Sequence, residues 1–166
     1  MTRSLICQTM RRKIFCMARL TAADDALITT FGRLVEAETS LSRALGRELE
    51  RQCAISHTTF EVLLRISRSD GGELSMSSLA QQVALTSGGI TRLLDRMIEG
   101  GLVDRVPSAS DRRVSYAALT PEGRSVLDAA KRVHAANLRR VFADFDALQL
   151  GELDRLLDKL RAVELS

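Results

Sequence analysis

The sequence predicts a mainly α-helical fold with a small amount of strand (α+β), in a chain whose length corresponds to one domain. Hydrophobic residues make up 45% of the 166 residues, but aromatic residues make up only 4% and there is no Trp. This balance is typical of helices packed through aliphatic side chains, because strand-rich folds favour β-branched and aromatic residues. Long stretches near both ends repeat apolar residues at helical spacing, and a hairpin pattern lies between them.

Residues 1–22 are expected to lie outside this fold, as a disordered extension or an over-long translation start with Met17 as the true one. Residues 1–20 contain five basic residues and no acid, so the other 19 basic residues face 21 acids. The sequence pI near 9.0 therefore does not by itself indicate a nucleic-acid partner. The apolar runs are too short and too interrupted by charge for a signal peptide or a membrane span, which predicts a cytoplasmic protein.

A long helix is predicted from Ala23 to Gln52, with a narrow apolar seam for packing against another helix. The seam consists of Leu27, Phe31, Leu34, Leu41, Leu45 and Leu49, with Glu38 in one slot. Thr58 and Glu61 have the spacing of a capping box, which predicts a second helix with His57 just before its cap. Next come a turn at 70–72 and a short strand at 73–75. This strand is expected to pair with the later hairpin.

Two short helices come next, one over 77–84 and one from Thr86 to Glu99, where Gly100 and Gly101 end it. Apolar residues on one face of the second helix predict its core side: Ile90, Leu93, Leu94, Met97 and Ile98. The opposite face carries Gly88, Thr91, Arg92 and Asp95. Two short helices with a tight turn are typical of a helix-turn-helix, whose second helix lies in the major groove of DNA.

A hairpin follows directly, with strands over 102–106 and 114–119 and a turn cluster at 107–110. Asp111, Arg112 and Arg113 lie at its charged tip. A hairpin directly after a recognition helix is a wing, and arginines at its tip can reach the phosphate backbone or the minor groove. Residues 54–119 are therefore expected to form a winged helix-turn-helix DNA-binding region.

Thr120, Pro121 and Glu122 predict the start of a further helix through an N-cap, a proline at the first position and an acid in the first turn. A last helix is expected to open near Asp146. His134 and Asn137 interrupt the apolar face of the first of these helices, either as pocket-lining groups or as satisfied interface polar groups. The seams of 23–53 and 120–166 are too long for the winged unit to cover, which predicts a dimerisation region shared between two copies.

Three blocks give these elements a specific resemblance. They are Gly100-Gly101-Leu102-Val103, Ser110-Asp111-Arg112-Arg113-Val114 and Leu119-Thr120-Pro121-Glu122-Gly123. In this order and spacing they resemble the MarR family of bacterial winged-helix repressors, over roughly residues 25–164. The resemblance implies an obligate homodimer, a pseudo-palindromic operator and, often, a small-molecule or redox signal. It also implies that Asp111 braces Arg113, which inserts into the minor groove.

The predicted function is that of a sequence-specific DNA-binding transcriptional regulator, a repressor, that a small-molecule effector releases from double-stranded DNA. Ser87, Gly88 and Thr91 are expected to approach phosphates or base edges. Arg92 is the candidate for a guanine contact, with Asp95 one turn away to orient it. Arg112 is assigned to a phosphate.

Two alternatives remain open. One is a redox-sensing regulator acting through Cys53, against the simpler interpretation of Cys53 as a small buried apolar residue. The other is a winged-helix protein-interaction module without DNA binding, because residues 86–113 hold five bases and four acids. An enzyme is not expected, and neither is a metal or cofactor. The chain has two histidines, no Cys/His metal spacing, no glycine-rich phosphate loop and no nucleophile elbow.

Overall fold

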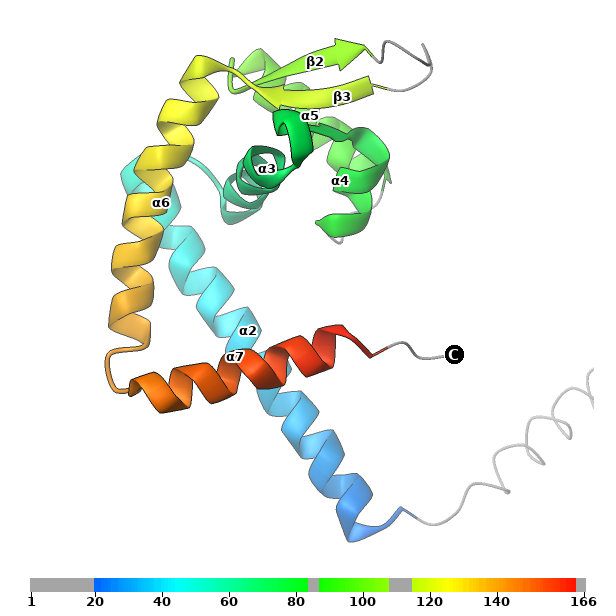
Figure 1. Cartoon of the computed structure of the whole chain (residues 1–166), viewed down its shortest axis with the longest axis vertical. Coiled ribbons are helices and arrows are strands. Elements are labelled where there is room, and N and C mark those ends of the chain that lie inside the picture. The colour runs from blue at the N-terminus through cyan, green and yellow to red at the C-terminus, as the bar shows by residue number, and fades with distance from the viewer. Residues whose placement is uncertain (1–19, 84–86, 108–114, 164–166) are drawn as a thin grey trace, which may run out of the picture. The chain divides into compact units, whose positions relative to one another are not determined.

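The computed structural model describes residues 20–83, 87–107 and 115–163. The elements in chain order are α2 (Ala22–Cys53), α3 (His57–Arg68), the 3-10 turn η1 (Asp70–Gly72), β1 (Glu73–Ser75), α4 (Met76–Gln82), α5 (Ser87–Glu99), β2 (Val103–Pro107), β3 (Ser115–Leu119), α6 (Pro121–Val141) and α7 (Ala147–Arg161) (Figure 1). They divide into two compact units, 1–41 and 42–166, with the boundary inside α2. The mainly helical fold class is confirmed.

In the first unit, the described residues are the start of α2 and the two residues before it. This part of the helix leaves large apolar side chains in solvent, and Leu27 and Phe31 are 69% and 67% exposed. Ile28, Leu34 and Val35 are also exposed.

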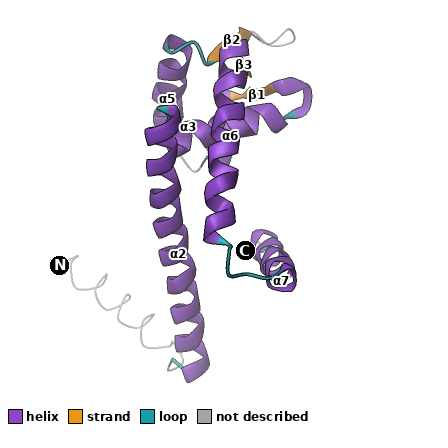
Figure 2. Cartoon of the chain, turned by 90° about the vertical axis from the view of Figure 1, so that its left-hand side faces the viewer, coloured by secondary structure: helices purple, strands orange, loops and turns teal. Residues whose placement is uncertain are grey.

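In the second unit, three strands form an antiparallel sheet in the order β1-β3-β2, coloured orange in Figure 2. β1 pairs with β3 through Leu74 and Ala117, which confirms the strand expected at 73–75. β2 and β3 form the predicted hairpin, and Pro107 and Ser115 are the last paired residues before its tip. Figure 1 shows α3, α4 and α5 below this hairpin.

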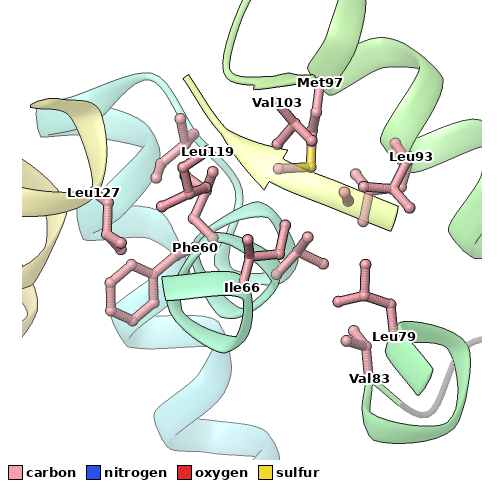
Figure 3. Packing of buried hydrophobic residues seen from close by; sticks show 14 of the residues in the cluster. Phe60, Ile66, Leu79, Val83, Leu93, Met97, Val103, Leu119 and Leu127 are labelled. Carbon is pink, nitrogen blue, oxygen red and sulfur yellow. The ribbon is translucent and has the colours of Figure 1, made fainter. Parts of the chain in front are cut away.

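One hydrophobic core joins these helices to the sheet and to α6. The labelled part of it in Figure 3 consists of Phe60, Ile66, Leu79, Val83, Leu93, Met97, Val103, Leu119 and Leu127. Phe60 of α3 lies beside Leu127 of α6 in this view. The winged-helix elements and the first part of α6 therefore share one core, which fixes α5 relative to the hairpin.

The start of α3 differs from the sequence prediction. Its N-cap is Ser56, whose hydroxyl accepts the N–H of Thr59 at 3.1 Å, so the capping box expected at Thr58 and Glu61 is wrong. His57 is accordingly the first residue of the helix and does not precede its cap. The reason is local, because Ser56 has an extended backbone (φ −72°, ψ 159°) and supplies the cap two residues earlier.

The starts of α6 and α7 agree with prediction. Thr120 caps α6, with Pro121 as its first residue. Asp146 and Gln149 form a capping box at the start of α7. Along α7 and beside its two ends, apolar side chains remain in solvent: Phe145, Leu148, Leu150, Leu156, Leu157, Leu160 and Val163. None of the helices in the described ranges combines the length and apolar character needed to cross a membrane.

Candidate nucleic-acid interface

Helices α4 and α5 form the helix-turn-helix of the second unit. Ser75 caps α4 by accepting the N–H of Ser78 at 3.2 Å, and α4 ends at Gln82, two residues before the predicted end. Helix α5 has the predicted bounds to within one residue. Of its predicted core face, Ile90, Leu93, Leu94 and Met97 are buried, and Ile98 is half-buried and packs against the same core.

The other face of α5 is open to solvent. Gly88, Thr91 and Arg92 are exposed, and a Cβ placed on Gly88 would meet nothing within 4 Å. Within the described ranges, Arg92 has no hydrogen bond or ion pair, so its guanidinium is available to a partner. Ser87 begins the helix, but its side chain lies outside the described part of the structure. The structure therefore places Gly88, Thr91 and Arg92 together on one accessible face.

Asp95 does not orient Arg92, as the sequence had suggested. Its carboxylate pairs with Arg105 of β2 at 3.0 Å, and not with Arg92 one turn earlier on the same helix. The two side chains are 51% and 47% exposed, so the pair links the solvent side of α5 to the first strand of the wing. Sequence reasoning missed Arg105 because strand β2 brings it beside α5, and no helical spacing relates it to Asp95.

The residues of two sequence blocks, 100–103 and 119–123, meet where α5, β2 and α6 join, and their contacts show why glycine and threonine stand there. Gly101, which has φ +69°, ends α5. The N–H of Gly101 donates to the carbonyl of Ile98, and the N–H of Leu102 donates to the carbonyl of Met97, at 2.9 Å each. This is a Schellman ending, which favours glycine. Thr120 donates its hydroxyl to the carbonyl of Gly101 at 2.7 Å and its N–H to that of Leu102 at 3.2 Å.

Gly123 completes this junction. Its N–H is donated to the hydroxyl of Thr120 at 2.8 Å, and its position lies against the backbone of Leu102. A Cβ at this position would be 1.9 Å from the Leu102 carbonyl oxygen, so only glycine fits without movement of the backbone. The direction in which the chain leaves α5 for the wing is therefore held by the end of α5 and by the start of α6.

The wing tip is the remaining predicted contact. Asp111, Arg112 and Arg113 all lie outside the described residues, between the ends of β2 and β3. Their predicted roles in the minor groove and on a phosphate stay predictions. What the described strands establish is the hairpin that carries them.

Three residues singled out in the sequence lie away from α5. Cys53 is a free, half-buried thiol packed against the core. Asn137 lines an open cavity of about 330 Å³ between α2 and α6, together with Arg47, Glu48 and Arg140. His134 was expected either to line a pocket or to be a satisfied interface group, but its Nδ1 is buried and has no hydrogen-bond partner in the part of the chain that the structure describes. Across 20–83, 87–107 and 115–163, no group of three or more His, Cys, Asp or Glu side chains is arranged to hold a metal ion.

A helix-turn-helix whose second helix exposes one polar face, followed directly by a hairpin packed on the same core, defines a winged helix-turn-helix protein. Comparison with known proteins makes the class specific. Residues 55–114 match the model of the MarR family. A curated relative, the HTH-type transcriptional repressor Rv2887 of Mycobacterium tuberculosis, is 35% identical over 101 residues, covering 61% of this chain and 71% of its own. The chain belongs to the MarR family of transcriptional regulators.

Two further relatives agree with this assignment. HTH-type transcriptional regulator SarZ of Staphylococcus haemolyticus is 30% identical over 109 residues, 66% of this chain and 69% of its own. Matches to three other regulators cover only 54% to 64% of their lengths. Among solved structures, Sco3205, a MarR family transcriptional regulator from Streptomyces coelicolor in complex with DNA, is 27% identical. It gives a TM-score of 0.73 over 86% of this chain and 91% of its own.

Proposed function

We propose that this protein is a sequence-specific DNA-binding transcriptional regulator, a repressor, that acts as a homodimer on a pseudo-palindromic operator. The observation that carries the proposal is the exposed face of α5, where Arg92 has no partner among the described residues and stands next to small side chains. Membership of the MarR family supports the same function, as does the DNA complex of the similar regulator Sco3205.

In this proposal the N-terminal half of α5 enters the major groove. Arg92 donates two hydrogen bonds to the O6 and N7 atoms of a guanine, the commonest specific contact of arginine with DNA. Gly88, which has open space at its Cα, allows the helix backbone to come close to a phosphate. Ser87 and Thr91 complete this contact surface.

The wing makes the second contact. Arg113 inserts into the minor groove, Asp111 braces it, and Arg112 binds a phosphate. A carboxylate that holds a guanidinium reduces the entropy lost when the arginine inserts. Arg105 takes no part, because Asp95 neutralises it and ties its strand to α5.

The homodimer is supported by apolar surface that each unit leaves uncovered. In the second unit, Leu160 and Leu157 of α7 are 56% and 39% exposed. In the first, Phe31 of α2 is 67% exposed. Burying a large apolar side chain contributes about 1.5–3 kcal/mol, so several such residues favour association. A two-fold dimer presents two copies of α5 to half-sites about 34 Å apart.

The main experiment measures binding to the DNA upstream of the protein's own gene by fluorescence anisotropy. We expect Arg92→Ala to weaken binding about tenfold or more and to relax the preference at one base position, since a bidentate guanine contact discriminates by about 1–3 kcal/mol. Arg132→Ala is the matched control, because Arg132 is an exposed arginine on α6. An equal loss of DNA affinity in both variants would mean that Arg92 contributes only its positive charge, and would contradict a guanine contact. Absence of binding by the unaltered protein would favour a protein-interaction module.

The dimer is tested separately by light scattering on the purified protein. We expect twice the mass of one chain, and a shift toward one chain in Leu160→Asp. Asp154→Lys, which also changes charge on the exposed surface of α7, is the control and is expected to remain a dimer. A single-chain mass for the unaltered protein would refute the homodimer.

Release by a small-molecule effector is the last part of the proposal. The cavity between α2 and α6, about 330 Å³, has the size of a small-ligand site, and Arg47 and Arg140 on its wall favour an anionic molecule. The test adds small organic acids to the protein–DNA complex and follows anisotropy. Leu45→Trp, which fills the cavity, is expected to abolish any release that the unaltered protein shows.

A further inference from the structure

The two histidines of this protein meet at the contact between α3 and α6. His57 starts α3, His134 lies on α6, and their ring centroids are 6.0 Å apart. Phe60 lies against both rings, with its centroid 4.8 Å from that of His134 and 6.5 Å from that of His57. The sequence contains only these two histidines. All of the histidine chemistry of this chain is therefore concentrated in one cluster.

The cluster offers little to stabilise a positive charge on His134. Its Nδ1 is buried and has no hydrogen-bond partner among the described residues. A protonated imidazole has two N–H donors, and burying one of them without an acceptor costs free energy. Burial lowers the pKa of His134, the nearby His57 lowers it further, and Glu61 acts in the opposite direction.

The other elements around the cluster add few compensating charges. From α3, the groups that act on His134 are His57 and Glu61, and Arg65 one turn later has its own Nε buried without a partner. From α2, Gly46 is the position beside His57, where an added Cβ would be 3.3 Å from the His57 Cβ.

The titratable α2 side chains on the Gly46 face are the exposed Arg43 and Glu50 and the half-buried thiol of Cys53. On α6 itself, Lys131 one turn earlier pairs with Asp128 at 3.5 Å, and both side chains are largely exposed. Glu61 is therefore the single acid that acts on His134 among the described residues.

We propose that His57 and His134 form a pH-sensitive joint between α3 and α6, which acidification loosens by placing like charges side by side in a partly buried contact. The joint matters because α3 belongs to the winged-helix core, whereas α6 leads to α7 and its exposed apolar side chains. In this proposal, loosening it weakens the hold of α6 on the winged-helix core that carries α5. The consequence for DNA binding rests on the proposed function, but the joint itself does not.

The direction of the effect follows from proton linkage. Because the folded protein holds the pKa of His134 below its ordinary value near 6.5, the unfolded chain takes up the proton first as pH falls. Stability is therefore complete above that value and decreases as pH falls below it. One linked proton changes the folding equilibrium constant by up to about tenfold per pH unit.

The first test is a titration of the full-length protein by proton NMR, in which two imidazole signals are expected. His57→Gln and His134→Gln assign the signals. We expect the His134 signal to titrate below pH 6.5, and His57→Gln to move its midpoint upward. A His134 signal that titrates at the ordinary value and is unaffected by loss of His57 would overturn the proposal.

The second test measures urea unfolding between pH 5.0 and 8.0, at one protein concentration. We expect the unaltered protein to lose stability below pH 6.5, and His134→Phe, which replaces the imidazole with an apolar ring, to lose much less. His134→Gln serves the same purpose if the larger ring disturbs packing. The same decrease in the variants as in the unaltered protein would refute the joint.

DNA binding is then followed over the same pH range in the unaltered protein and in His134→Phe. We expect affinity to fall on acidification in the first and to fall less in the second. If the chain binds no DNA at any pH, the proposed function fails, whereas the NMR and unfolding results still decide the joint. If binding shows the same pH dependence in both proteins, the link between joint and recognition helix is wrong.

Discussion

Replacing Gly123 with alanine tests the close approach of α6 to the end of α5. A Cβ at Gly123 would lie 1.9 Å from the carbonyl oxygen of Leu102, where real contacts of this kind begin near 3.0 Å. It would also lie 2.9 Å from the carbonyl carbon, so relief requires movement of the backbone and not of a side chain. The same oxygen accepts the N–H of Thr120, so that movement also disturbs the start of α6.

Two effects of opposite sign decide the magnitude. Alanine is favoured over glycine inside a helix by about 1 kcal/mol. Overpacking a tight site costs about 1–3 kcal/mol, and occasionally more. The contact at Gly123 is with backbone and is far below van der Waals distance, so the upper part of that range applies. We expect Gly123→Ala to lose about 2 kcal/mol of stability after the helix-forming gain is included.

The assay is urea unfolding followed by circular dichroism, at one protein concentration because the stability of a dimer depends on concentration. Gly151→Ala is the matched control, since Gly151 lies in α7 and a Cβ there would meet nothing within 4 Å. We expect that variant to gain about 0.5–1 kcal/mol. Equal unfolding midpoints for the two variants would refute the close approach at Gly123.

Three other predictions concern the same region. Thr120→Ala should cost about 1 kcal/mol in urea unfolding, because the hydroxyl caps Gly123 and bonds the Gly101 carbonyl; Thr120→Ser should keep most of that stability. Asp95→Ala should change stability by less than about 1 kcal/mol, because its pair with Arg105 is exposed. It should also strengthen binding to unrelated DNA in anisotropy by freeing Arg105. Arg113→Ala should weaken DNA binding and reduce the slope of log K against log salt by about 0.9 without changing the dimer mass. Equal binding across salt concentrations would contradict that role.

Elements with local signals were predicted well from the sequence. Thr120 with Pro121 is a start signal contained in a few residues, and α6 starts where it indicates. Helix α7 opens at Asp146 as expected, although its capping box with Gln149 was not recognised in the sequence. The exception was α3, where Ser56 and Thr58 are both suitable caps and only the extended backbone of Ser56 decides between them. Helix boundaries are hard to predict when two capping residues stand this close together.

Contacts between elements were predicted less well. Asp95 was assigned to Arg92 because helical spacing is visible in a sequence, whereas the approach of β2 to α5 is not. The two histidines posed the same problem, since no spacing rule relates the first residue of α3 to the middle of α6. Each of these contacts depends on how helices and strands pack, which a single sequence does not reveal.

Because Asp95 pairs with Arg105, Arg92 is left without an ion pair among the described residues. An acid on the exposed face of α5 would repel phosphate and compete with DNA for Arg92, but this acid is already occupied by the strand beside it. Meanwhile the Gly101 ending and the Thr120 contacts hold both β2 and α6 against the end of α5. The buried face and the C-terminal end of α5 are therefore both held by the rest of the second unit. In the proposed pH response, the contact of α6 with α3, where the two histidines lie, is a second connection between α6 and the core that carries α5.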